Sequence, residues 1–125
     1  MNLSFMLDEL NNDSLKKVEQ LVQYLKKRDM TTTKLRNVFG QLRQFEAKEK
    51  AEPSKTLNNS NEFLLMGTRF KYIMDKERGT KEGDLKDFGK SLYALIQGVE
   101  NKTEKFENMM HHMEALVALS KAELK

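Results

Sequence analysis

The sequence contains no cysteine, little glycine and proline, and no long apolar run. The lack of cysteine excludes a disulfide framework, a thiolate metal site and a cysteine nucleophile. Six glycines and one proline among 125 residues are too few turn residues for an all-β sandwich or barrel. No apolar stretch approaches the roughly 20 residues that cross a bilayer. We therefore expect a soluble, cytoplasmic, mostly helical domain that makes no membrane contact.

Charge is unevenly distributed along the chain, although the net charge is only +3. Residues 1–13 contain three acids and no base, whereas residues 14–50 contain ten bases and four acids. The acidic start, with Asp8 and Glu9, also differs from the basic and apolar start of a signal peptide. The basic excess after residue 13 is compatible with binding a polyanion through one face, and an ordinary solvated surface is the alternative.

Apolar residues recur at spacings of three and four along nearly the whole chain, which predicts one buried stripe on each of five helices. We expect Asp13, the threonines 31–33, Asp84 and Thr103 to cap the starts of the first, second, fourth and fifth helices. Gly79 is expected to end the third. The predicted stripes are Leu15, Val18, Leu21, Val22 and Leu25; Leu35, Val38, Phe39, Leu42 and Phe45; Phe63, Met66, Phe70, Ile73 and Met74; Leu85, Phe88, Leu92, Leu95 and Ile96; and Phe106, Met109, Met110, Met113, Leu116 and Val117.

These helices predict an all-α fold, a compact five-helix bundle that forms a single domain over residues 1–125. Residues 1–12 are expected to be a loosely attached N-terminal lead, with one loose helical turn within residues 3–10. Pro53 and the nearby polar residues place the main loop at about 51–60.

Residues with catalytic or metal-binding chemistry are sparse. His111 and His112 are the only histidines, and adjacent helical positions diverge by about 100°, so the two cannot ligate one metal. The stretch from Gly83 to Ser91 has five residues between its glycines, where a phosphate-binding loop needs four. The eight methionines favour core packing over a ligand site. We expect no enzyme activity, no cofactor and no metal.

The basic residues follow regular helical spacing. On the expected second helix, Arg36, Arg43 and Lys50 are seven apart and therefore lie on one flank. Such rows can follow a phosphate backbone, or they can cover apolar surface with their aliphatic stems. On the third helix the same spacing relates Lys71 to Arg78 and Arg69 to Lys76.

Two segments carry a family resemblance. The stretch Thr31-Thr32-Thr33-Lys34-Leu35-Arg36-Asn37 and the stretch Met113-Glu114-Ala115-Leu116-Val117-Ala118 resemble the small helical subunit of the type III-A CRISPR interference (Csm) complex. That family has a similar helix start and a similar final helix, with an arginine-containing helix between them. The resemblance covers residues 30–121 approximately.

The resemblance implies a non-enzymatic subunit that functions in antiviral defence. Several copies would stack into an inner filament that faces the duplex of guide RNA and target RNA, beside the backbone and large subunits of the complex. A small DNA-binding regulator and a helical adaptor that binds no nucleic acid are the alternatives. The candidate RNA-binding residues are Lys34, Arg36, Asn37, Arg43, Arg69, Lys71 and Arg78.

Overall fold

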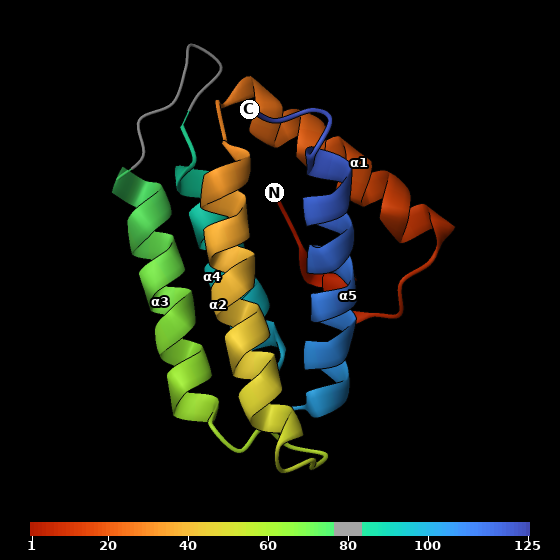
Figure 1. Ribbon diagram of the computed structural model, residues 1–125, viewed down its shortest axis with the longest axis vertical. Coiled ribbons are helices and arrows are strands. Elements are labelled where there is room, and N and C mark those ends of the chain that lie inside the picture. Colours follow the sequence, from red (N-terminus) through yellow and green to blue (C-terminus); the bar gives the residue numbers. More distant parts are fainter. Residues whose placement is uncertain (77–83) are drawn as a thin grey trace.

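In a computed structural model, residues 1–76 and 84–125 are described, and they form five α-helices and one short 3-10 helix (Figure 1). Helix α2 lies at the front of the bundle between α3 and α5, α4 lies behind it, and α1 crosses the outer side of α5. The predicted all-α, five-helix, single-domain fold is confirmed. The elements are η1 (Ser4–Leu7), α1 (Asn12–Lys27), α2 (Thr32–Lys50), α3 (Ser60–Lys76), α4 (Lys86–Gly98) and α5 (Thr103–Ser120).

Two of the predicted helix caps are wrong. Helix α1 is capped by Asn11, not by Asp13, because the Asn11 side chain accepts a hydrogen bond from the Ser14 amide at 2.9 Å. The Ser14 hydroxyl in turn accepts from the Asn11 amide at 2.9 Å, which completes a reciprocal capping box. Helix α5 starts at Thr103, and its N-cap is Lys102, without a capping side chain. The Thr103 amide donates to the carbonyl of Lys55, so the loop takes the place of a cap.

Of the other predicted caps, Thr31 is confirmed, and Asp84 lies one residue before the N-cap of its helix. Thr31 caps α2, because its hydroxyl accepts from the Lys34 amide at 3.2 Å. Asp84 accepts from the Lys86 amide at 3.0 Å, although the N-cap position of α4 belongs to Leu85. Gly79 lies outside the described residues.

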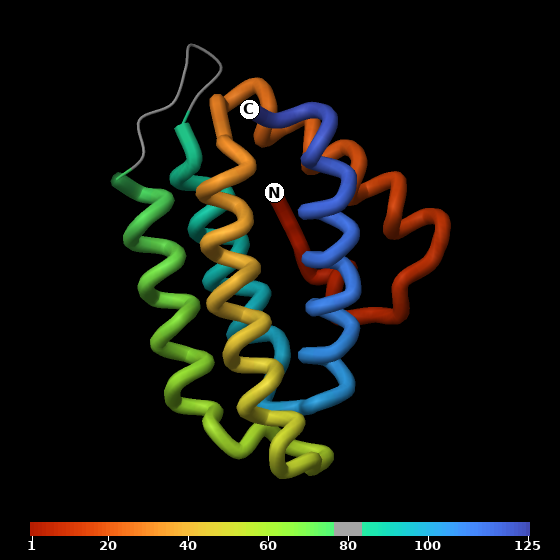
Figure 2. The backbone as a smooth tube through the Cα atoms, viewed as in Figure 1, coloured from red at the N-terminus to blue at the C-terminus, as the bar shows by residue number. Residues whose placement is uncertain are grey.

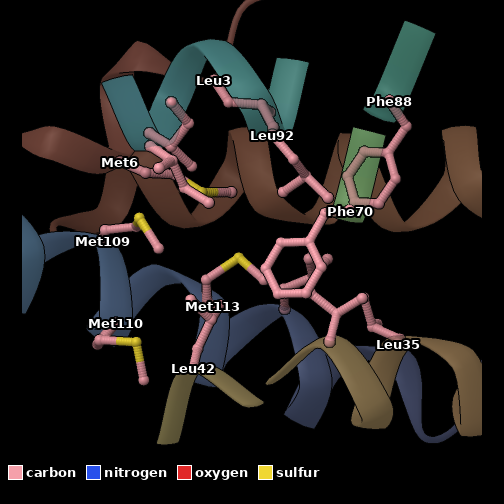
Figure 3. Close-up of a cluster of buried hydrophobic side chains, with 14 of the residues drawn as sticks. Leu3, Met6, Leu35, Leu42, Phe70, Phe88, Leu92, Met109, Met110 and Met113 are labelled. Carbon is pink, nitrogen blue, oxygen red and sulfur yellow. The ribbon is translucent and has the colours of Figure 1, made fainter. Parts of the chain in front are cut away.

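Most of the core is formed by the predicted stripes, and its centre is rich in methionine and phenylalanine (Figure 3). The core also contains six residues that the stripes did not include: Leu3, Met6, Met30, Leu57, Val99 and Leu124. One predicted core residue is wrong: Ile73 is 40% exposed, because it lies beside the buried face of α3 rather than on it. Leu15, Phe39 and Val117 are half-buried. The side chains labelled in Figure 3 come from the N-terminal segment and from α2, α3, α4 and α5: Leu3, Met6, Leu35, Leu42, Phe70, Phe88, Leu92, Met109, Met110 and Met113.

The N-terminal segment packs against the bundle, so the expectation of a loosely attached lead is wrong. Leu3 and Met6 are only 4% and 0% exposed. The Asn108 side chain donates to the carbonyl of Leu7 at 2.9 Å, and the Ser91 hydroxyl donates to the carbonyl of Met1 at 3.0 Å. The segment therefore closes the side of the bundle between α4 and α5.

The connection between α2 and α3 spans residues 51–59, at the bottom of the view in Figure 2. The buried carboxylate of Glu49 holds the connection in place, since it accepts hydrogen bonds from the amides of Asn58 and Asn59 and from the Asn59 side chain, at 2.5–3.1 Å. The Leu57 amide also donates to the carbonyl of Asn101 in the turn between α4 and α5. The loop is thus fixed at both ends.

Candidate nucleic-acid interface

Helix α2 carries exposed cations on two flanks, and one of these flanks faces α5. Arg36, Arg43 and Lys50, which we call the Arg36 row, are all exposed. Arg43 shows which way this flank faces, because its guanidinium lies 3.9 Å from the carboxylate of Glu114 on α5. Since residues seven apart share a helix face, Arg36 and Lys50 point to the same side.

Carboxylates already occupy two members of the Arg36 row. The half-exposed guanidinium of Arg43 is 3.0 Å from Glu46, and the ammonium of Lys50 is 3.8 Å from the other oxygen of the same carboxylate. Within residues 1–76 and 84–125, no ion pair or hydrogen bond involves the side chain of Arg36. Arg36 is therefore the member of the row whose charge is most available to an external anion.

The second flank of α2 faces α3. The Lys48 ammonium lies 2.9 Å from the Glu62 carboxylate of α3, which fixes the facing sides of the two helices. Lys34 lies fourteen residues before Lys48, and Arg69 lies seven residues after Glu62, so both share these facing sides. Arg69 therefore lies on the side of α3 that faces α2, whereas Arg36 lies on the flank of α2 that faces α5.

The remaining candidate residues lie on other faces of α2 and α3. Asn37 is exposed on the outer face of α2, next to Arg36. The Lys71 ammonium lies 5.0 Å from the ring of Tyr93, which places Lys71 on the side of α3 that meets α4. Arg78 lies outside the described residues. Within residues 1–76 and 84–125 the candidates thus occupy several faces, and among them only Arg36 and Arg43, with Lys50, form a row.

Sequence reasoning missed the burial of three ionisable side chains, Glu46, Glu49 and His112. His112 is fully buried: its Nδ1 donates to the carbonyl of Asn108 at 2.8 Å, and its ring meets Phe5 edge-on. Residue 112 lies three residues after Met109 and four before Leu116, on the apolar stripe. This spacing could have predicted that His112 is buried. His111 is exposed.

The shifted pKa values belong to groups outside the α2 flanks. A hydrogen bond from Lys105 lowers the pKa of Glu100, and one from Lys26 lowers the pKa of Glu123. Burial raises the pKa of Tyr24. Among the described residues, no group of three or more acids and histidines is arranged to hold a metal ion. In the same part of the chain, no helix is long and apolar enough to span a membrane.

The chain folds as a small all-α bundle, and it carries the two sequence segments described above. The family model described as Csm2 Type III-A matches residues 8–125, so the chain belongs to that family. It is a small subunit of a type III-A CRISPR complex and associates with the other subunits of that complex. The suspected resemblance is confirmed. No curated protein and no solved structure matched the chain.

Proposed function

We propose that this subunit contacts the duplex of guide RNA and target RNA through the Arg36 row and that it contributes no catalytic group. In this proposal several copies stack side by side within the complex, and each presents α2 to the RNA. The observation that carries the proposal is the exposed guanidinium of Arg36, which has no protein partner among the described residues. A planar guanidinium suits a phosphate because it donates two parallel hydrogen bonds.

The two other members of the Arg36 row, Arg43 and Lys50, are expected to contribute less to RNA binding than Arg36. Arg43 and Lys50 both pair with the carboxylate of Glu46. The two cations and this one anion together have a net charge near +1, whereas the two cations alone would have +2. Phosphate would have to compete with Glu46 for either cation. We therefore assign Arg36 the largest share of the binding free energy and assign Arg43 and Lys50 a steering role.

The non-catalytic role rests on where the histidines lie. His112 is fully buried in the core, where no substrate reaches it. His111 is exposed on α5, one residue away, and points to solvent. We therefore propose that target cleavage is performed by other subunits of the complex.

The test is RNA binding by complexes reconstituted with variant subunits at several salt concentrations. Arg36→Glu is expected to weaken target RNA capture roughly tenfold, which corresponds to about 1.4 kcal/mol. The slope of log affinity against log salt should fall by roughly one unit for each phosphate that the variant no longer neutralises. Arg36→Glu combined with Arg69→Glu should weaken capture further, because it also removes a cation from the side of α3 that faces α2.

The matched control is Lys90→Glu, which makes the same change of charge on an exposed residue of α4, at the back of the bundle. Lys90→Glu should leave affinity and salt slope unchanged. Cleavage positions should be the same in all complexes. Equal affinity for the wild type and the double variant, with both incorporated, would reject the α2 flanks as the RNA-binding surface.

A further inference from the structure

The solvent-facing side of α2 carries a second row of polar side chains beside the Arg36 row. Asn37 and Gln44 are both exposed and lie seven residues apart, so they share one line along the helix. We call these two residues the amide row. Within residues 1–76 and 84–125, no hydrogen bond involves the side chain of Asn37 or of Gln44. Their donors and acceptors are therefore available to an external ligand.

Two small residues separate the amide row from the Arg36 row. Gly40 and the exposed Ala47 lie between the rows, again seven residues apart. Arg36 and Arg43 lie about 40–60° to one side of Gly40, and the amide row lies at about the same angles to its other side. A Cβ at Gly40 would meet no described atom within 4 Å. The small residues bind nothing themselves, but a broad ligand can lie across them and touch both rows at once.

The ion pairs of α2 leave this face open. The contact between Arg43 and Glu114 turns one flank of the helix toward α5, and the contact between Lys48 and Glu62 turns the other toward α3. The side between the two flanks, which carries the amide row, therefore points away from the bundle. In Figure 1 this helix lies at the front of the view, between α3 and α5.

A carboxamide suits the 2′-hydroxyl of ribose. The carboxamide both donates and accepts hydrogen bonds, and so does the hydroxyl. An A-form RNA duplex displays its 2′-hydroxyls in a wide, shallow minor groove, whereas side chains cannot read its deep, narrow major groove. A helix face with short side chains along its centre fits the shallow groove. The Arg36 row then meets the phosphates at one edge of that groove.

We propose that α2 lies across the minor groove of the RNA duplex and that Asn37 and Gln44 form hydrogen bonds with ribose 2′-hydroxyls. This inference rests on the proposed function and deepens it, because it names the sugar as the group that is recognised. The Arg36 row binds phosphates, which RNA and DNA share. The amide row adds the preference for RNA over DNA.

Recognition of bases by the same two amides is the competing interpretation. Asparagine and glutamine bind adenine through two hydrogen bonds in the major groove of B-form DNA. The major groove of an A-form duplex does not admit them, and the base edges in a minor groove distinguish few base pairs. We therefore expect the amide row to favour RNA without a preference for base sequence.

The test measures target binding by complexes reconstituted with the wild-type subunit or with the double variant Asn37→Ala/Gln44→Ala. Each complex is offered an RNA target and a 2′-deoxy target of the same sequence, and a second set carries 2′-deoxy sugars in the pairing part of the guide. A heteroduplex of RNA and DNA keeps its A-form geometry, so the deoxy strand removes hydroxyls without removing the groove. Both substituted residues are exposed, and alanine favours a helix, so the variant should fold.

The double variant is expected to reduce the preference for the RNA strand that faces α2 by roughly threefold or more, with little change in affinity for the deoxy strand. Its salt slope should equal that of the wild type, because no charge is lost. Arg36→Glu should do the opposite: it should weaken binding of both sugars equally and lower the salt slope. The matched control, Gln20→Ala/Gln97→Ala, removes two exposed carboxamides from α1 and α4 and should change neither quantity.

Gly40→Leu tests the close approach of the duplex. The site is open and leucine favours a helix, so the variant should fold, yet its side chain should hold the duplex away from both rows and weaken binding of RNA and deoxy targets alike. Unchanged affinity in this variant would overturn the inference.

The remaining outcomes separate the inference from the proposed function. An unchanged RNA preference on both strands in the double variant, with Arg36→Glu still weakening capture, would reject the amide row and keep the proposed function. Unchanged capture in both variants would reject α2 as the RNA-binding helix. A loss that depends on base sequence and persists with deoxy strands would overturn the inference in favour of base reading.

Discussion

The two sides of the bundle are held together in different ways. Helices α3 and α4 approach closely because glycines face the partner helix: a methyl group at Gly89 would lie 2.7 Å from Cβ of Met74, and one at Gly67 would lie 3.1 Å from Ile96. On the α5 side, long methionine side chains and the N-terminal segment fill the space (Figure 3). Packing between α3 and α4 therefore depends on glycines, which have no side chain. Packing on the α5 side depends on flexible methionine side chains. The two sides should therefore differ in what they tolerate.

The largest loss of stability is expected from a charge buried on the α5 side. Met113 is 0% exposed on α5, so Met113→Asp buries a carboxylate without a partner and should cost more than about 4 kcal/mol, enough to unfold the domain. His111→Ala, two residues away on the exposed face, should change the melting temperature little. Circular dichroism melts of both variants test the assignment, which fails if the two effects occur in the reverse order.

A single methyl group should distinguish the two sides. Gly89→Ala places Cβ against Met74 and 3.2 Å from the backbone oxygen of Lys71, which cannot rotate away. We expect a loss of about 1–3 kcal/mol in the free energy of unfolding, measured by urea titration. Met109→Leu on the α5 side changes shape without changing volume and should cost less than about 1.5 kcal/mol.

Gly40→Ala is the control for helix propensity, because Gly40 lies within α2 and a methyl group there would meet no atom within 4 Å. This substitution should stabilise the protein by about 0.5–1 kcal/mol. If Gly89→Ala stabilised the protein to the same extent, the close contact between α3 and α4 would not constrain the fold.

The smallest effects concern the start of α1. Asn11→Ala removes the capping side chain and should cost about 1 kcal/mol. Asp13→Ala leaves the capping box intact and removes only a charge that favours the first turn, so it should cost a few tenths of a kcal/mol. Thermal melts of the two variants decide between the caps, and an equal loss for both would contradict the assignment to Asn11.

Much of the fold could be predicted because each helix has its own periodic stripe. Phe88, Leu92 and Leu95 lie where the spacing predicts. The errors occurred where tertiary contacts decide. Ile73 is apolar and correctly spaced, yet the close approach of α4 turns the buried face of α3 away from it. His112 has a polar side chain, yet the stripe and Phe5 enclose it.

The candidate site was only partly predictable. The spacing of seven correctly placed Arg36 and Arg43 on one flank, because that relation is internal to one helix. How two helices face each other is set by packing between them, as the Lys48–Glu62 and Arg43–Glu114 contacts show. The sequence could therefore not separate Arg36 from Arg69.

The contacts of the N-terminal segment also affect how the chain is made. Asn108 and Leu7 are 101 residues apart in sequence, and Ser91 and Met1 are 90 apart. Helical bundles usually fold fast because most of their contacts are local. Here Leu3 and Met6 are synthesised well before α4 and α5, the helices against which their segment packs. They must stay exposed until α4 and α5 have been made. Docking of this segment is therefore expected to be a late step of folding, and the nascent chain is expected to be most prone to aggregation before it docks.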